Sequence, residues 1–382
     1  MNLLIVTTSY PDESEGEAAA GVFVRDFVRA LNEQGHRVHI VAPGAEQRDT
    51  NEQGILVKRF TVPKKPLSLL KPQKPRDWPA IIQTLRNGQR AVYAACRENR
   101  FDHIFALWVL PSGAWARSAA KRSGISYGTW ALGSDIWSLG KVPVVRQLLK
   151  WVLRGARYRY ADGFQLAGDV ERISGMGCSF LPSARRLSVP QVRPVSQTPP
   201  YRLAFLGRWH LNKGIDLLLE ALQRLNDKDW QRIEAVRIFG GGPMEDLIRT
   251  QGEHLKERGR PVEIGGYLNR NGAADLLSWT DFVLIPSRIE SIPVIFSDAM
   301  QMNRPVIAMP VGDLPTLIDT HRCGLVAEQV SAIALTTALQ TALRDKTSTY
   351  AEGIKAACLQ FDINESARRF IHGLENQHNV GD

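Results

Sequence analysis

The stretch PSRIESIPVIFSDAM occupies residues 286–300 and directly follows the apolar run VLI at 283–285. A short apolar run that gives way to a polar loop is typical of a buried strand. Pro293 suits the first turn of a helix, and we predict that helix over 293–302. Strand, loop and helix follow one another here, as they do in the repeating unit of parallel sheets.

The loop and the helix carry two acidic residues. Glu290 lies just before the predicted helix, and Asp298 lies inside it. Val294 and Asp298 are four residues apart, so they share one helix face and lie about 6 Å apart along the axis. This arrangement favours phosphates at the helix N-terminus and a ribose against Asp298. The alternative, which stays open, is an exposed loop acid and a solvated helix residue.

Strands and helices alternate outward from this stretch through both halves of the chain. Such alternation specifies parallel sheets covered by helices on both faces, so the fold class is α/β with two doubly wound, Rossmann-like domains. The predicted strands are 1–6, 38–41, 104–107, 127–132, 202–206, 235–239, 283–285 and 305–308, and the predicted helices are 21–31, 80–98, 112–122, 214–225, 244–257 and 293–302.

The length of 382 residues favours two domains over one compact core. Residues 189–200 contain four prolines and almost no periodicity, which is typical of an interdomain linker. We therefore predict an N-terminal domain at 1–196 and a C-terminal domain at 197–360. Residues 361–382 are expected to form a C-terminal helix that returns to the first domain.

The composition excludes several classes of protein. Hydrophobic residues make up 44% and charged residues 23%, which is ordinary globular usage rather than that of a disordered or coiled-coil chain. The four cysteines form no CxxC pair, which argues against a zinc site and favours a reducing compartment such as the cytoplasm. No apolar run approaches the roughly 18 residues of a membrane span, and the N-terminus lacks the basic segment of a signal peptide.

The formal net charge of +9 is unevenly distributed. Residues 1–196 hold 28 Lys and Arg against 16 Asp and Glu, whereas residues 197–382 hold 20 against 23. The asymmetry suggests that the first half meets an anionic membrane, a phosphorylated acceptor or nucleic acid, the alternative being a basic surface without a partner. No nucleic-acid-binding motif is present, so nucleic acid is not expected as a partner.

Ligands of open parallel sheets bind beyond the carboxyl ends of the strands, so the loops there hold the candidate residues. The loop GRWHLNKG at 207–214 places Arg208 and Lys213 where they would neutralise a diphosphate, unless they are merely solvated cations. The loop GGGPME at 240–245 ends in glutamate and therefore fails the GxGxxG fingerprint, which disfavours a nicotinamide dehydrogenase. Its glycines still leave room for a ligand, whereas residues 310–315 are more typical of a plain turn.

Together these residues resemble the family-4 glycosyltransferases of the GT-B fold, over nearly the whole chain. Five segments of the family pattern occur here in the family's order. The segment G-R-x4-K-G lies at 207–214 and the glycine-rich turn at 240–243. The segment P-S-x-x-E-S-x-P with a later acid–alanine pair lies at 286–299, P-V-I-A at 305–308 and G-x-x-P at 312–315. The resemblance implies two domains that face each other across a central cleft. The C-terminal domain would hold a nucleotide-sugar donor and the N-terminal domain an acceptor.

By resemblance, Arg208 and Lys213 bind the donor diphosphate, Glu290 contacts the transferred sugar and Asp298 contacts the ribose. Arg208, Lys213 and Glu290 are thus the expected catalytic residues. The expected donor-binding residues are Gly207, Arg208, Lys213, Gly241, Gly242, Glu290, Ser291, Val294 and Asp298. The segments Gly21-Val22-Phe23 and Leu132-Gly133-Ser134-Asp135 resemble the family's glycine-containing loop and its His-Gly-Ser-Asp segment, so the expected acceptor or cleft residues are Gly21, Val22, Phe23 and Asp135.

Three positions depart from the family pattern. Asp298 stands where the family has Glu, so a ribose contact becomes longer or water-mediated. Leu132 replaces a His, which removes a polar contact to the transferred sugar. Asn303 stands where Gly is common, a mild change because Asn tolerates the left-handed conformation.

The resemblance implies a retaining hexosyltransferase that acts on a glycan or lipid-linked acceptor in cell-surface polysaccharide or glycolipid biosynthesis. The donor would be a UDP- or GDP-sugar, with no metal or other cofactor. The alternatives are a GT-B nucleotide-sugar epimerase and a nucleotide-sugar-binding protein that has lost catalysis.

Residues 141–160 are predicted to form a basic amphipathic helix. One face carries Arg146, Lys150, Arg154 and Arg157, and another carries Val145, Leu148, Leu149 and Val152, with Trp151 available at an interface. Such a helix favours binding to anionic lipid and a peripheral position at the inner membrane face. The alternative is a domain helix that buries its apolar face in the core.

Overall fold

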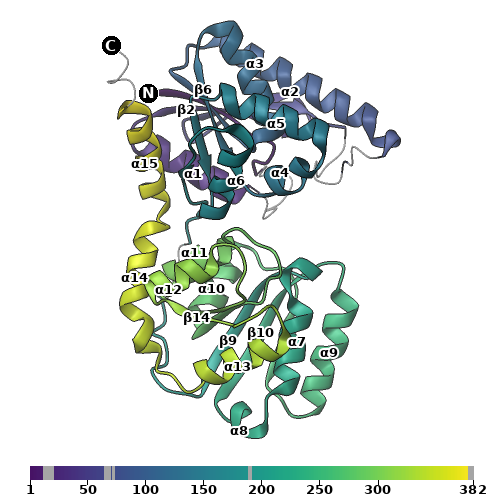
Figure 1. Cartoon of the computed structure of the whole chain (residues 1–382), viewed down its shortest axis with the longest axis vertical. Helices are drawn as coiled ribbons and strands as arrows, with labels where there is room; N and C mark the ends of the chain where they lie inside the picture. Colours follow the sequence, from purple (N-terminus) through teal and green to yellow (C-terminus); the bar gives the residue numbers. More distant parts are fainter. Residues whose placement is uncertain (12–20, 64–69, 71–73, 188–191, 377–382) are drawn as a thin grey trace. The chain divides into compact units, whose positions relative to one another are not determined.

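The computed structural model describes residues 1–11, 21–63, 70, 74–187 and 192–376. The chain forms two compact units, each with its own sheet (Figure 1). Unit 1 comprises Met1–Ser183 together with the C-terminal residues from Ser366 on, and unit 2 comprises Ala184–Glu365.

Unit 1 is built on an eight-stranded sheet whose strands are β1 (Asn2–Val6), β2 (Arg37–Gly44), β3 (Arg48–Glu52), β4 (Ile55–Thr61), β5 (His103–Leu107), β6 (Ser126–Ala131), β7 (Tyr158–Ala161) and β8 (Ser179–Phe180). They pair in the order β3-β4-β2-β1-β5-β6-β7-β8, and all pairs are parallel except β3 with β4. Because β1 lies between β2 and β5, the chain winds away from it in both directions. The switch point of unit 1 therefore lies beyond the carboxyl ends of β1 and β5.

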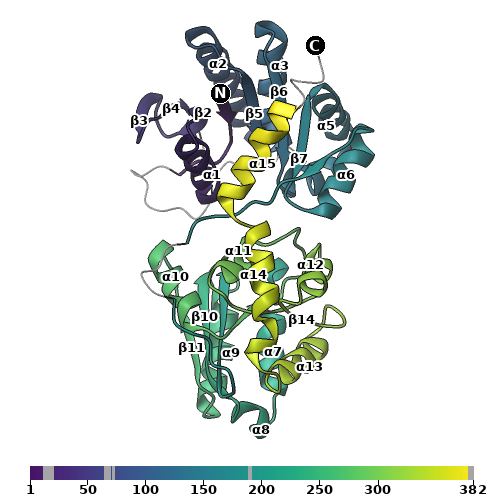
Figure 2. The same cartoon turned by 90° about the vertical axis from the view of Figure 1, so that its left-hand side faces the viewer.

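Helices cover both faces of this sheet. The helices of unit 1 are α1 (Val22–Glu33), α2 (Trp78–Glu98), α3 (Ala114–Ser123), α4 (Ser134–Trp137), α5 (Pro143–Gly155), α6 (Phe164–Ser174) and α15 (Ile363–Asn376). In Figure 2, α15 crosses in front of the strands beside α1, and the ring of its Phe370 lies 4.3 Å from that of Phe105 and 5.7 Å from that of Phe27. One core cluster joins Val92, Trp115 and Leu149, from α2, α3 and α5.

Unit 2 has a six-stranded, fully parallel sheet with strands β9 (Tyr201–Arg208), β10 (Ile233–Gly241), β11 (Val262–Gly265), β12 (Phe282–Ile285), β13 (Val306–Ala308) and β14 (Gly324–Val326). The order β11-β10-β9-β12-β13-β14 reverses between β9 and β12. The helices are α7 (Ile215–Arg224), α8 (Asp227–Trp230), α9 (Glu245–Glu257), α10 (Arg270–Trp279), α11 (Val294–Gln301), α12 (Leu314–His321), α13 (Ala332–Ala342) and α14 (Ala351–Gln360). Two doubly wound sheets confirm the predicted fold class.

The predicted strands and helices all correspond to elements of the structure, with ends that differ by a few residues. The central strands are apolar because both of their faces are covered: Leu3, Leu4, Ile5 and Val6 are fully buried. The prediction missed the edge strands β3, β8, β11 and β14, the inner strands β4 and β7, and several helices, among them α6, α10 and α13.

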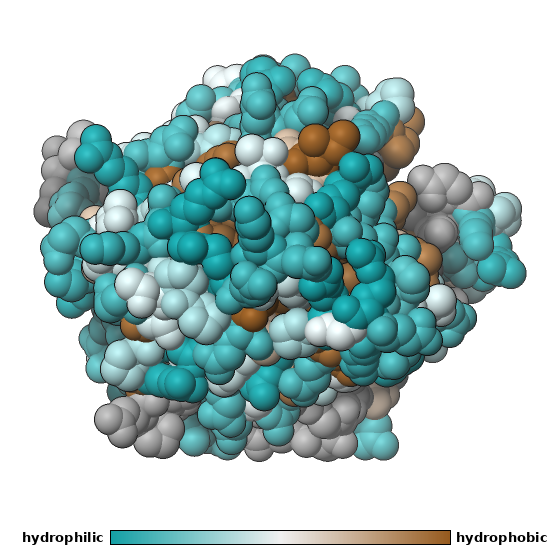
Figure 3. Space-filling model, turned by 90° about the horizontal axis from the view of Figure 1, so that it is seen from below, coloured by the Kyte–Doolittle hydropathy of each residue, from teal (hydrophilic) through white to brown (hydrophobic). Residues whose placement is uncertain are grey.

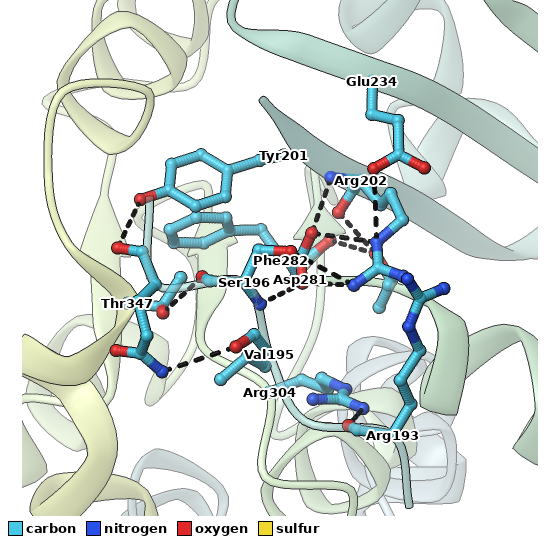
Figure 4. Close-up of polar contacts among 12 residues, drawn as sticks. Arg193, Val195, Ser196, Tyr201, Arg202, Glu234, Asp281, Phe282, Arg304 and Thr347 are labelled. Carbon is cyan, nitrogen blue, oxygen red and sulfur yellow. Dashed lines mark hydrogen bonds and ion pairs between the residues drawn. The ribbon is translucent and has the colours of Figure 1, made fainter. Parts of the chain in front are cut away.

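The described part of the proline-rich segment, 192–200, does not lie between the two units, and this corrects the predicted boundary at 196. The units divide between Ser183 and Ala184, and residues 192–200 belong to unit 2. Figure 4 shows Ser196 beside the buried Asp281 of unit 2: the Ser196 backbone N–H donates to Asp281 Oδ1 at 2.8 Å, and Thr347 Oγ1 donates to the Ser196 carbonyl at 2.7 Å. Prolines lack backbone donors, but the residues between them still bond to unit 2.

The predicted helix over 141–160 is also shorter than expected. Helix α5 ends at Gly155, and the chain turns into β7 at Tyr158. The backbone N–H of Arg157 donates to the carbonyl of Tyr127 at 2.8 Å, so Arg157 continues toward the sheet rather than along the basic helix face. Arg157 matched the helical spacing of the basic face, but it lies in the bend between α5 and β7.

Candidate active site

The two loops with the predicted donor-binding residues meet at the switch point of unit 2. Strand β9 pairs with β12, so the loops that follow them lie beside each other beyond the carboxyl edge of the sheet. The first loop contains a single 3-10 turn, Leu211–Lys213, and the second runs from Pro286 to Pro293.

The two loops are bonded to each other through their backbones. The Arg288 N–H donates to the Asn212 carbonyl at 2.8 Å. Gly214 has a φ of 64°, and a Cβ added there would lie 1.8 Å from the Pro286 carbonyl oxygen. Only glycine satisfies both the left-handed conformation and this close approach. Contact between the two loops thus explains Gly214, the second glycine of the GRWHLNKG segment.

A cation and an acid from these loops form an ion pair. Lys213 Nζ bonds to Glu290 Oε1, and Ser287 Oγ donates to the same oxygen at 3.3 Å. The side chain of Lys213 is 36% exposed and that of Glu290 is 14% exposed, so the pair borders solvent. Arg208, at the end of β9, is exposed, and the described part of the chain shows no hydrogen bond or ion pair of its side chain.

The glycine turn after β10 packs against the first loop. A Cβ on Gly240, whose φ is 152°, would lie 1.9 Å from the Gly207 carbonyl oxygen. Gly241 accepts hydrogen bonds at its carbonyl from the Trp209 N–H at 2.9 Å and from the Tyr267 hydroxyl at 2.7 Å. Close packing within the protein therefore accounts for Gly240, and the predicted ligand contacts of Gly241 and Gly242 stay predictions.

Helix α11 starts one residue later than predicted. Pro293 has an extended ψ of 138° and caps the helix, which begins at Val294. Ser291 is buried, and its carbonyl accepts from the Asp313 N–H at 3.2 Å, which joins the loop at 310–315 to the same region. The Asn303 that follows the helix has a φ of 56°, the left-handed conformation that asparagine tolerates.

Asp298 has a protein partner that the sequence did not suggest. Its carboxylate is fully buried and accepts from Arg185 Nε at 3.0 and 2.9 Å. Arg185 lies just after the unit boundary in a segment without periodicity, so no sequence signal marks it. The predicted ribose contact of Asp298 stays a prediction.

The predicted residues of unit 1 lie at its own switch point. Gly21 has a φ of 87° and precedes α1, Val22 is the first residue of that helix, and Phe23 is half-buried. Asp135 is buried, and its oxygens accept from the backbone N–H groups of Val109 at 2.7 Å and Leu132 at 3.2 Å. Burial raises the pKa of Asp135 to about 6, against the opposing effect of these backbone donors.

Among the described residues, no group of three or more His, Cys, Asp or Glu side chains is placed to hold a metal ion. The helices of the described segments include none that is both long and apolar enough to cross a membrane.

Comparisons with known proteins agree with this architecture. A model of glycosyl transferases group 1 matches residues 200–345, and a model of the glycosyl transferase 4-like domain matches residues 18–175. TuaC of Bacillus subtilis (strain 168), named as a glycosyltransferase of teichuronic acid biosynthesis, is 25% identical over 97% of both chains.

Two solved structures share the fold. Sucrose-phosphate synthase from Thermosynechococcus elongatus superposes with a TM-score of 0.75 at 18% identity and covers all of both chains. HepE from Anabaena, in complex with UDP and glucose, has a TM-score of 0.70 at 14% identity over 98% of this chain and 100% of its own. With both domain models matched in order on two doubly wound sheets, the chain belongs to the family-4 glycosyltransferases of the GT-B fold and is a glycosyltransferase.

Proposed function

We propose that this enzyme transfers a hexosyl unit from a nucleoside-diphosphate sugar to a glycan or lipid-linked acceptor, with retention of anomeric configuration, in cell-surface polysaccharide or glycolipid biosynthesis. The observation that supports it is the meeting of Lys213 and Glu290 at the switch point of unit 2. The name of TuaC supports the biosynthetic setting, and the UDP and glucose bound to HepE support a nucleotide-sugar donor.

The proposed chemistry depends on charge. As the glycosidic bond breaks, negative charge develops on the departing diphosphate, and fixed cations stabilise it. Lys213 and Arg208 supply two cations, and the N-terminus of α11 adds its partial positive charge. Glu290 contacts the transferred sugar. When the donor phosphates bind, the ion pair between Lys213 and Glu290 opens in part, and Lys213 contacts the phosphates.

The test is nucleotide release and its dependence on acceptor. UDP- and GDP-sugars are screened by thermal shift, since a bound donor raises the melting temperature by mass action. The stabilising donor is then incubated with and without a polyprenyl-diphosphate-linked saccharide. Release of nucleoside diphosphate only with acceptor, and a new glycosidic product, supports transfer. Conversion of the donor sugar to its epimer without acceptor would identify the epimerase instead, and binding without turnover would identify a binding protein.

We further propose that α5 contacts an anionic membrane surface. Val144, Leu148 and Trp151 recur at spacings of four and three, and all three are exposed, Val144 by 79%. Exposed Arg146 and half-buried Lys150 lie on the same helix. Leu149, Val152 and Leu153 are buried in the core, so the helix both packs against unit 1 and presents an apolar stripe with cations to solvent.

The proposed stripe is small. It consists of three exposed side chains, those of Val144, Leu148 and Trp151. Figure 3 views the molecule from below the orientation of Figure 1, and on that face hydrophilic residues predominate and hydrophobic residues form small, separate groups. Membrane binding through α5 therefore depends on electrostatic attraction as well as on apolar burial, and it is expected to weaken with salt.

A further inference from the structure

Trp108 occupies an unusual position at the switch point of unit 1. It directly follows β5, beside β1, where ligands of such sheets bind. Its φ is 66° and its ψ is 124°, a conformation that bulky L-residues rarely adopt. The described part of unit 1 has only one other non-glycine residue with a positive φ, Gln53. Strained backbone of this kind persists only where the surrounding structure holds it, and it is concentrated at functional sites.

The backbone around Trp108 is held from both sides. The Trp108 N–H donates to the Trp130 carbonyl at 3.0 Å, and the next N–H, that of Val109, donates to Asp135 Oδ2 at 2.7 Å. The second oxygen of Asp135 accepts from the Leu132 N–H at 3.2 Å. A buried carboxylate is costly, and here it fixes the loops after β5 and β6 in one arrangement. We therefore regard Asp135 as a positioning residue for Trp108.

The indole of Trp108 is part of an aromatic cluster whose members differ in burial. It packs edge-on against Phe23, with ring centroids 6.0 Å apart and an interplanar angle of 65°, and Phe23 in turn contacts Trp130 at 5.9 Å. Trp130 is fully buried, whereas Phe23 and Trp108 are half-buried. Gly21 brings the start of α1 against the loop after β1, since a Cβ there would lie 2.8 Å from Ser9.

We propose that Trp108 and Phe23 form the platform on which a pyranose ring of the acceptor saccharide stacks. A pyranose carries an apolar face of C–H groups, which matches the negative face of an indole, while its hydroxyls stay at the edge. A purely structural tryptophan would need neither partial exposure nor a strained backbone. The proposal rests on the proposed transferase function and names the acceptor class for unit 1: a neutral sugar ring, distinct from the anionic donor of unit 2.

The first test does not depend on activity. The chain contains nine tryptophans. With 5-fluorotryptophan incorporated, the fluorine signal of Trp108 is identified by its loss in Trp108→Phe, and that of the exposed Trp78 by its loss in Trp78→Leu. Methyl glucoside, methyl galactoside and methyl N-acetylglucosaminide are titrated, with glycerol as the control polyol. We expect a saturable shift of the Trp108 signal with at least one saccharide, and no shift of the Trp78 signal.

The second test measures transfer. Trp108→Leu keeps an apolar side chain but removes the aromatic face, so the KM for acceptor is expected to rise roughly tenfold or more, while the affinity for UDP or GDP stays unchanged. Trp108→Phe is expected to retain part of the affinity, and Trp78→Leu all of it. A Trp108 signal that no saccharide moves, or that glycerol moves equally, would overturn the platform. Absence of donor binding in the unaltered protein would instead overturn the proposed function, while the fluorine titration still decides on the platform.

Discussion

Replacement of Lys213 by alanine tests the assignment of the donor diphosphate. A charge-assisted contact contributes roughly 1.5–3 kcal/mol, so its loss is expected to weaken UDP or GDP binding by roughly ten- to 150-fold. The ion pair with Glu290 must open, at least in part, for the phosphate to bind. Because the pair is 36% and 14% exposed, it is worth at most about 1 kcal/mol, and the net effect of the cation remains large.

Glu290→Gln is the matched control, because it removes the carboxylate of the ion pair and keeps the Lys213 amine. Freed from its partner, Lys213 is expected to bind UDP or GDP as before or up to about fivefold more tightly. Arg208→Ala removes the second cation and should weaken binding in the same direction as Lys213→Ala. Titration calorimetry gives the affinities, and thermal unfolding shows that each variant is folded.

Two outcomes would refute the reasoning. If Lys213→Ala and Arg208→Ala bind UDP and GDP as tightly as the unaltered protein, the diphosphate does not lie at this switch point. If Lys213→Ala weakens binding but has no effect in the Glu290→Gln background, Lys213 only neutralises Glu290 and does not contact the donor.

Three further outcomes are expected. Asp281→Ala leaves the buried Arg202 without its carboxylate, so it should destabilise unit 2 by about 3–5 kcal/mol in chemical denaturation; an unchanged midpoint would contradict this. The pKa of Asp135 is about 6 in the folded chain, against its ordinary value of 3.8. The free energy of unfolding, relative to that of Asp135→Asn, should therefore fall by up to about 3 kcal/mol as pH rises from about 4 to about 6. Above that range the difference should stay level. At about 1 kcal/mol per cation, the double variant Arg146→Gln, Lys150→Gln should bind phosphatidylglycerol vesicles roughly 30-fold more weakly in sedimentation. A charge-matched double variant in unit 2 should bind as the unaltered protein does. If the unaltered protein binds neutral vesicles equally well, α5 is a core helix only.

The sequence by itself determined the class of fold and the loops in which the candidate residues lie. Strands that are buried on both faces are short continuous apolar runs, and amphipathic helices have a periodicity of about 3.6 residues, so both can be recognised without tertiary contacts. The loops after the strands at 202–206 and 283–285 stood out because ligands bind beyond the carboxyl ends of parallel strands. The left-handed conformation of Asn303 agrees with the resemblance, since glycine is common at that position of the family and asparagine tolerates the same conformation.

Only the tertiary structure decided which side chains bond to one another. Lys213 and Glu290 are 77 residues apart, and Arg185 and Asp298 are 113 residues apart. Partners at such separations leave no periodic trace in the sequence, because the fold brings them together only after the sheet has set the order of its strands. For the same reason the prolines at 189–200 predicted an interdomain linker, whereas the buried carboxylate of Asp281 binds the backbone of Ser196 and joins it to unit 2.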